Sequence, residues 1–499
     1  MAKSEEQPQA PQAEVTEEEV GSFMEQLEQP LRLKTDQAVQ EAKDAVQTLA
    51  EWALSEEDLV SEDAIRTIRA VIGELDKKLS EQLNHVMHHE KFQKVEGAWR
   101  GLHHLVNNTQ TGEDLKIRVL NASKEELRKE IKKFKGSAWD QSPLFKKVYD
   151  QEYDMPGGEP YGCLIGDYYF DHSPTDLSVL KGLGRVASAA HAPFISGSSP
   201  ELFQLESWQE LDKPRDLSKV FQMKEYAPWR SFRESEDSRY VALTLPRFLS
   251  RLPYGAETEP VDEFDFEEET GAGDHSKYTW ANAAYAMGTN ITRAYSEHGW
   301  CAAIRGKESG GQVDELPCHT FPTDDGGQDM KCPTEIAITG RREKQLSDLG
   351  MLPLCHYKNT DYAVFFGAQM VHEPKEYDDP DATANEELSA KLPNLMAVSR
   401  FAHYLRRMVR DKIGSFKERE DMERWLNNWI QNYVLTDPEN APEEARAKYP
   451  LREAEVEVQP VEGDPGYYNA QFYLRPHYQL EGVNVSLRLA SKMPSVKEE

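Results

Sequence analysis

The chain is long and strongly acidic. Its 499 residues suffice for about three domains at roughly 150 residues each. The 58 basic and 88 acidic residues give a formal net charge of −30, which argues against a general affinity for phosphate backbones, because such binding needs clustered Lys and Arg. The hydrophobic share of 38% can still build folded cores, so the low mean hydropathy indicates acidic solvated stretches rather than global disorder.

The sequence predicts a cytoplasmic protein. No stretch approaches the ~18 apolar residues of a membrane span, and residues 1–19 lack the apolar core of an export signal. The cysteines are few, odd in number and without CxxC spacing: Cys163, Cys301, Cys318, Cys332 and Cys355. We therefore expect free thiols in a reducing compartment rather than a disulfide framework.

The N-terminal part divides into a tail and a helical region. Residues 1–15 are rich in Pro, Gln and Glu and predict a disordered acidic tail, and residues 16–110 predict a helical region. The region opens with a capping box, Thr16 to Glu19, and a short helix that Pro30 ends. One face of this helix carries Val20, Phe23, Met24 and Leu27. A helix this short is marginal alone, so it either docks on its own domain or fits the groove of a partner.

Further along this region, two longer helices each keep one apolar face. The second of them carries apolar residues at steps of three and four: Ile65, Ile68, Ile72, Leu75, Leu79, Leu83 and Val86.

Residues 111–390 predict a mixed α/β body. We expect strands at 115–119, 162–169, 241–245, 300–305, 335–339 and 362–366. We expect helices at 176–190, 279–295 and 341–349, and a further helix opened by a capping box of Ser123 and Glu126. Residues 257–274 contain nine acidic residues and no basic one. They predict a solvated loop, because no EF-hand spacing is present.

Residues 391–499 predict a C-terminal domain that begins with a helix at about 395–413. Basic residues at steps of three, four and three share one face of it: Arg400, His403, Arg407 and Arg410. Val398, Ala402, Leu405, Val409 and Ile413 form the opposite, buried stripe. The basic face is either an ordinary solvated face or a cationic ridge that docks on an acidic partner.

Apolar-alternating strands follow at 454–458, 467–474 and 483–489. The last strand carries Val483, Val485, Leu487 and Leu489. It is predicted to leave an unpaired edge that can pair with another strand.

Motifs of enzymes are weak in this chain. Residues 182–187 fit the dinucleotide form GxGxxA, but that form needs a helix that opens on the glycines. The preceding residues already predict a helix capped by Ser173, so Gly182 and Gly184 are better explained as close-packing positions. No P-loop or GxSxG elbow occurs. We expect no cofactor and no metal; a nucleotide-dependent enzyme that uses Gly182 to Ala187 stays as the alternative from another class.

Long blocks of the chain resemble one known family. EGAWRGLHHLV, LTLPRFLSRLPYG, WANAAYAMGTNITRAYSEHGWCAAIRG, CPTEIAITGRREKQLSDLGMLPLCHYKNTDYAVFFGAQ and VSRFAHYLRRMVRDKIGSFKEREDMERWLNNWIQNYV closely resemble TssC, also called VipB. That family is the large contractile-sheath subunit of bacterial type VI secretion systems. The resemblance runs from about residue 22 to the C-terminus. A phage-tail-like contractile sheath protein is the nearest alternative of the same mechanical kind.

The resemblance implies partners and roles but no active site. It implies a heterodimer with the small subunit TssB, homo-oligomeric stacking around a tube of Hcp on a baseplate, and disassembly by the ClpV ATPase. Arg400, Arg407 and Arg410, with His403 on the same face, would attach the tube. Residues 483–489 would be donated to a sheet in an adjacent subunit. Val20, Phe23, Met24 and Leu27 lie where the family carries its ClpV-recognition helix, which Pro30 shortens here.

Overall fold

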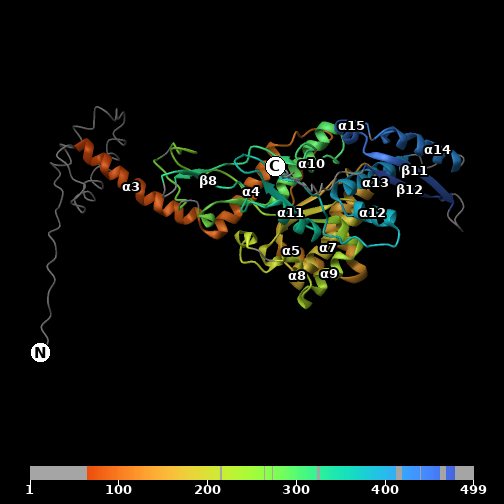
Figure 1. Cartoon of the computed structure of the whole chain (residues 1–499), viewed down its shortest axis with the longest axis horizontal. Coiled ribbons are helices and arrows are strands. Elements are labelled where there is room, and N and C mark those ends of the chain that lie inside the picture. Colours follow the sequence, from red (N-terminus) through yellow and green to blue (C-terminus); the bar gives the residue numbers. More distant parts are fainter. Residues whose placement is uncertain are drawn as a thin grey trace, which may run out of the picture. The chain divides into compact units, whose positions relative to one another are not determined.

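The computed structural model describes residues 64–477, apart from residues 214–215, 263, 272–273, 323–325, 412–418, 439 and 461–467. These described residues form two compact units. The smaller unit combines the chain up to Phe92 with Leu252–Lys277, and the larger one combines Gln93–Arg251 with the chain from Tyr278 onward (Figure 1). The chain therefore leaves the larger unit after Arg251 and re-enters it at Tyr278.

A six-stranded sheet forms the centre of the larger unit, with strand order β1-β2-β3-β9-β10-β6. Strands β1, β2, β3 and β9 run parallel, whereas β10 is antiparallel to both β9 and β6. The strands span Leu164–Phe170 (β1), Phe194–Ser198 (β2), Val241–Leu245 (β3), Gln312–Val313 (β6), Leu352–His356 (β9) and Ala363–Phe365 (β10). The short apolar runs of β2 and β3 are typical of parallel strands that are buried on both faces.

Helices cover both faces of this sheet. In β3, Val241 and Leu243 enter one core, and Ala242 enters the other, because successive side chains of a strand alternate. Helices α5, α7, α8 and α9 gather on one side (Figure 1). The helices of this part are α4 (Glu90–Asn107), α5 (Lys124–Lys133), α6 (Pro143–Phe145), α7 (Pro174–Ala190), α8 (Leu217–Phe221), α9 (Ala227–Arg233), α10 (Ala283–His298), α11 (Gly340–Asp348) and α12 (Pro380–Ser389). The predicted mixed α/β class is confirmed.

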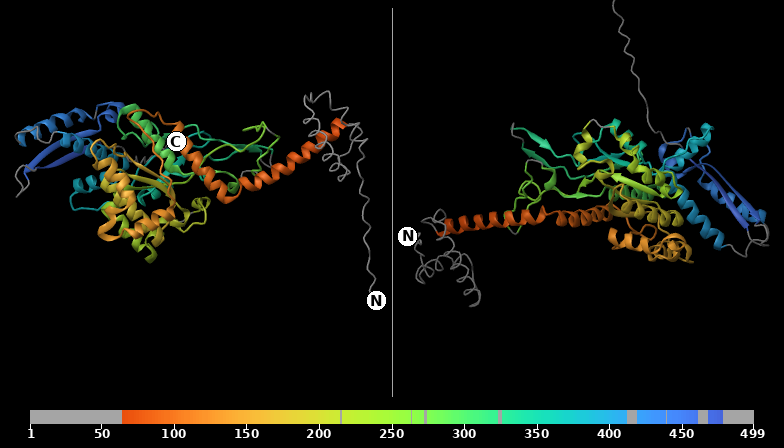
Figure 2. Two further views of the ribbon diagram at one scale, coloured as in Figure 1. Left: turned by 180° about the vertical axis from the view of Figure 1, so that it is seen from behind. Right: turned by 90° about the horizontal axis from the view of Figure 1, so that it is seen from below.

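The C-terminal part packs helices against a long β-hairpin, drawn in blue in Figure 2. It contains α13 (Leu392–Asp411), α14 (Arg419–Ile430), α15 (Glu443–Lys448), β11 (Leu451–Pro460) and β12 (Tyr468–Pro476). Phe401, Leu426 and Val456 are buried in its core. Trp300, from the segment after α10, stacks on Phe401 with ring centroids 4.4 Å apart. This stacking joins the hairpin layer to the rest of the larger unit.

The smaller unit consists of α3 (Ala64–Met87), the start of α4 and an acidic segment. The Asn84 side chain donates to the Glu267 carbonyl oxygen at 3.1 Å and accepts from the Glu269 backbone at 2.9 Å. Glu268 is buried, and its carboxylate accepts a hydrogen bond from the backbone of Tyr254. The segment predicted to be a solvated loop has no regular secondary structure where it is described, but it is not fully solvated, because the buried Glu268 side chain anchors it to the Tyr254 backbone.

Three predicted strands are wrong. Residues 115–119, 300–305 and 335–339 form no strand in the structure. In the first segment, the basic residues that alternate with apolar ones, Lys116 and Arg118, form ion pairs with Glu159 instead of lying on one face of a strand. In the second, Trp300 turns into the C-terminal core. An alternating pattern arises here from ion pairing or from packing, without a partner strand.

Helix starts follow the capping residues. The box of Ser123 and Glu126 forms as predicted and opens α5, and Ser173 caps α7. Helix α10 begins later than predicted, because Asn282 caps it and the preceding residues Trp280–Ala281 form β5, which pairs with β4 (Phe248–Leu249). No helix in the described part of the chain has the length and apolarity that crossing a bilayer would need.

Candidate functional site

Helix α13 carries the four residues predicted to face an acidic partner. The helix packs on two sides, because Phe401 and Leu405 enter the C-terminal core while His403 reaches the end of α7. His403 is buried, and its Nε2 donates to the Ala190 carbonyl oxygen at 2.9 Å. Placing His403 on an exposed cationic face is therefore wrong: α7 covers that turn of the helix.

Burial also changes the chemistry of this turn. It lowers the pKa of His403 to about 4, so the imidazole is neutral at pH 7, although the Ala190 carbonyl opposes the shift. Arg400 is half-buried, and its guanidinium lies over the rings of Tyr404 at 4.7 Å and Tyr295 at 5.6 Å. These cation–π contacts make Arg400 part of the packing of the helix.

Positive charge reaches the surface at the C-terminal end of α13. Arg407 is exposed and forms no ion pair with any residue that the structure describes. Arg410 lies 3.5 Å from an oxygen of Asp154, and Arg406, which the sequence pattern did not single out, pairs with the same carboxylate. The Arg406 guanidinium also lies 4.2 Å from the Tyr153 ring centroid. One carboxylate thus faces two arginines, and Arg407 stays available for another molecule.

The predicted apolar stripe of α13 is only partly correct. Leu405 is buried, but Val398, Ala402 and Val409 are half-buried. Ile413, the fifth residue of the predicted stripe, lies outside the described residues.

Helix α4 exposes an apolar face that the sequence analysis did not identify as a site. Val95, Trp99 and Val106 are 58%, 68% and 42% exposed. Their spacing of four and seven residues places them on one side of the helix. Tryptophan is normally among the better covered residues, so this face is unusual for the surface of a single folded chain.

Small residues and an ion pair fix the opposite side of α4. A Cβ atom at Gly97 would lie 2.4 Å from the Trp280 carbonyl oxygen, so only glycine permits this approach. Glu96 accepts from Arg251 Nε at 2.6 Å, where the two side chains are 12% and 3% exposed. Because these contacts hold this side of α4 against the larger unit, Trp99 points away from the body of that unit.

Helix α3 exposes a second apolar face in the smaller unit. Four residues of its predicted stripe, Ile72, Leu75, Leu79 and Val86, are 46%, 38%, 50% and 54% exposed. Val71 and Met87 are the buried apolar residues of this helix among those described. Among the residues that the structure describes, no neighbour covers these four side chains.

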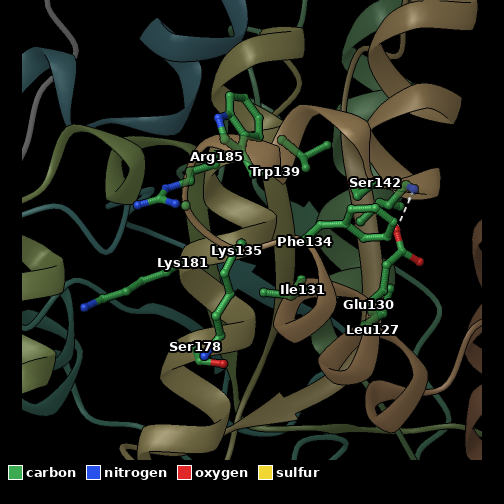
Figure 3. Close-up of a pocket in the computed structure, with 14 residues that line it drawn as sticks. Leu127, Glu130, Ile131, Phe134, Lys135, Trp139, Ser142, Ser178, Lys181 and Arg185 are labelled. Carbon is green, nitrogen blue, oxygen red and sulfur yellow. Dashed lines mark hydrogen bonds between the residues drawn. The ribbon is translucent and has the colours of Figure 1, made fainter.

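A groove between α5 and α7 encloses about 190 Å³ (Figure 3). Ile131, Phe134 and Trp139 line it, and Lys181 and Arg185 stand along α7. The groove is smaller than the roughly 300 Å³ at which small-molecule pockets begin. No three His, Cys, Asp or Glu side chains in the described ranges are grouped as metal ligands.

The GxGxxA motif contributes to this groove as a packing element. Gly182, Gly184 and Ala187 lie inside α7, which starts at Pro174. A Cβ atom at Gly182 would lie 2.7 Å from Ile131 of α5. A dinucleotide site needs a helix that begins at the glycines, so the nucleotide-binding alternative is wrong for this motif.

Two predicted sites lie outside the described residues. They are the N-terminal helix with Val20, Phe23, Met24 and Leu27, and the final strand with Val483, Val485, Leu487 and Leu489. Both stay predictions.

The sequence matches two family models that together span most of the chain. Residues 69–372 match "EvpB/VC_A0108, tail sheath N-terminal domain", and residues 381–493 match "EvpB/VC_A0108, tail sheath gpW/gp25-like domain". A Pseudomonas aeruginosa protein named type VI secretion system sheath protein TssC1 is 61% identical over 487 residues, which cover 98% of each chain.

Among solved structures, the anti-feeding prophage baseplate aligns with 76% of this chain and 84% of its own, at 10% identity and a TM-score of 0.35. The contracted sheath of the same particle aligns with 63% and 74%, at 10% identity and a TM-score of 0.29. The extent of the two family models and the identity to the Pseudomonas protein decide the assignment. The chain belongs to the VipB/EvpB family of type VI secretion tail-sheath proteins, and it is a structural subunit of a contractile sheath rather than an enzyme.

Proposed function

We propose that this sheath subunit pairs with a small TssB-like subunit, polymerises in the cytoplasm around an Hcp tube on a baseplate, and is disassembled by a ClpV-like ATPase after contraction. Family membership and the resemblance of the sequence blocks support the set of partners. The observation that carries the proposal is the exposed apolar surface of the single chain. Such surface is costly in water and is typical of subunits that exist in an assembly.

We assign the α4 face of Val95, Trp99 and Val106 to the small partner subunit. A tryptophan flanked by aliphatic residues is the composition of an interface hot spot. The helix is fixed to the larger unit by the pair of Glu96 and Arg251, so the face is preformed and loses little conformational entropy on binding.

Replacing Trp99 by Asp is expected to weaken heterodimer formation at least about 30-fold, since a hot-spot residue contributes about 2 kcal/mol or more and each 1.4 kcal/mol is about tenfold. The measurement is co-purification with the small subunit and its titration by calorimetry. Met155→Asp is the matched control, because Met155 is 55% exposed and lies outside the α4 face. Equal affinity of the two variants for the small subunit would contradict the assignment.

We assign tube attachment to the exposed end of α13, at Arg407 and Arg410. Arg400 and His403 support this end through their buried contacts and do not touch the tube in this proposal. Repeated weak contacts along a polymer sum to a large avidity while each contact stays breakable.

Reversing Arg407 and Arg410 to Glu should leave the heterodimer soluble and produce sheaths that lack a tube or fail to extend. Electron microscopy of co-expressed components measures the fraction of tube-filled sheaths. Arg424→Glu serves as a control, because that side chain is 73% exposed on the neighbouring helix α14. Tube-filled sheaths at the wild-type frequency in the double variant would refute the attachment.

The remaining roles rest on the family resemblance. We propose that residues 483–489 pair as a strand with a sheet in an adjacent subunit, and that Phe23, Met24 and Leu27 bind the ClpV-like ATPase.

A further inference from the structure

A thiol and an imidazole meet at one backbone carbonyl just after β9, and a second thiol lies beside the imidazole. His356 Nε2 donates to the Thr360 carbonyl oxygen at 2.8 Å, and Cys318 Sγ lies 3.6 Å from the same oxygen. Cys332 is hydrogen-bonded to the His356 side chain, and its sulfur lies 3.2 Å from Thr334 Oγ1. Because a carbonyl oxygen only accepts, His356 Nε2 carries a proton, and the other ring nitrogen can accept the proton of a thiol.

The strand register places the two thiols opposite each other. Strands β7 (Thr320–Pro322) and β8 (Gln328–Met330) are antiparallel, with Thr320 opposite Met330. The Lys331 backbone donates to the His319 carbonyl at 2.7 Å, which continues the ladder by one residue. Continued by one more residue, this register brings Cys318 opposite Cys332 at a non-hydrogen-bonded position, where facing side chains are closest, and Cys332 does act electrostatically on Cys318. The Cα–Cα distance typical of such positions, about 4.5 Å, lies within the range that a disulfide bond can span.

Cys332 differs electrostatically from the other cysteines. Burial raises the pKa of the Cys163 thiol to about 11 and that of Cys301 to about 12, and it also raises the pKa of Cys318 and Cys355. Burial acts on Cys332 in the same direction, but the hydrogen bonds from His356 and Thr334 outweigh it, and the pKa of this thiol is lowered. The pKa of His356 is raised against its own burial, chiefly by its bond to Cys332.

We propose that Cys332 is a reactive thiol that undergoes thiol–disulfide exchange with low-molecular-weight disulfides, with His356 as its activating partner and Cys318 as its resolving thiol. The class of reactant is a small, symmetrical disulfide such as glutathione disulfide. This site uses none of the residues assigned to the α4 and α13 surfaces and does not depend on their proposed roles.

The exchange is balanced in two steps. The Cys332 thiolate, whose proton passes to His356, attacks one glutathione sulfur; a protein–glutathione disulfide forms and a glutathione thiolate leaves. The Cys318 thiolate then attacks the Cys332 sulfur, forms the Cys318–Cys332 disulfide and releases the second glutathione. The two protein thiols are oxidised and one glutathione disulfide is reduced to two thiols.

Alkylation by iodoacetamide tests the activation. With substoichiometric reagent at pH 7, peptide mass spectrometry of the full chain should find Cys332 modified first. Replacing His356 by Gln should slow that modification about tenfold, the effect of raising the thiol pKa by about one unit. Thr334→Val should slow it less, and Cys355→Ser should leave it unchanged. Similar rates at all five cysteines, or an unchanged rate in His356→Gln, would overturn the proposal.

Glutathione disulfide tests the resolving step. The wild-type chain should lose the mass of two hydrogen atoms and yield a Cys318–Cys332 cross-linked peptide. Cys318→Ser should instead accumulate one glutathione adduct on Cys332, and Cys332→Ser should form neither product. A cross-link between other cysteines, or an adduct on Cys318 in the Cys332→Ser chain, would show that the thiol roles are wrong.

Discussion

Replacing Arg251 by Ala is expected to lower the free energy of unfolding of the larger unit by about 3–5 kcal/mol, because it leaves the Glu96 carboxylate buried without its main counter-charge. Arg251 Nε and Nη2 lie 2.6 and 3.3 Å from the two carboxylate oxygens of Glu96. Arg100 and Thr279 also donate to this carboxylate, at 2.9 Å each, and they limit the loss to that range. Urea unfolding of wild type and variant at pH 7 measures the difference.

The pH dependence distinguishes this ion pair from simple loss of packing. Burial by itself raises the pKa of Glu96, but the bonds from Arg251, Arg100 and Thr279 lower it below its ordinary value. A carboxyl with a depressed folded pKa stabilises the protein above its unfolded pKa, and that contribution is lost as pH falls through the folded value. Without Arg251, burial raises the folded-state pKa of Glu96 relative to the wild type. The difference in unfolding free energy between wild type and variant should therefore shrink between pH 7 and pH 4.

Arg424→Ala is the control for that measurement. Arg424 pairs with Asp421 at 2.7 Å, but both side chains are exposed, so its removal should cost under about 0.5 kcal/mol. A deficit in Arg251→Ala that matches this control, or that is constant with pH, would show that the pair does not anchor α4.

Local signals predicted helix starts well. A cap is satisfied within one helical turn, so the four residues from Ser123 to Glu126 contain all the information needed. The same holds for Ser173 and α7, and it explains why the sequence alone disfavoured a nucleotide site inside that helix.

Exposure could not be predicted in the same way. The three-four-three spacing correctly places the four predicted residues, Arg400, His403, Arg407 and Arg410, along one face of α13. However, α7 lies more than 200 residues earlier in the chain and covers His403. The apolar stripe of α3 was also predicted, yet no local pattern says whether a neighbour covers it. Trp99 was missed for this reason: the spacing of Val95, Trp99 and Val106 was available, but an amphipathic face normally indicates a core.

Replacing Gly97 by Ala is expected to destabilise the larger unit by about 2–3 kcal/mol, although alanine is the better helix former. The added Cβ would lie 2.4 Å from the carbonyl oxygen of Trp280, and Trp280 belongs to β5, which is held by its pairing with β4. Neither backbone can yield without breaking hydrogen bonds, so α4 must shift. A shifted α4 would also displace Trp99, and heterodimer affinity should fall together with stability.

Gly73→Ala in α3 is the matched control, because no atom lies within 4 Å of the Cβ position there. The same substitution should raise stability by up to about 1 kcal/mol through helix propensity alone. Paired urea melts and partner titrations of the two variants separate the close approach of α4 from propensity. If stability and partner affinity change in the same direction in both variants, this account is contradicted. If both fall only in Gly97→Ala, the close approach at Gly97 of the EGAWRG block positions the Trp99 surface on the far side of its helix.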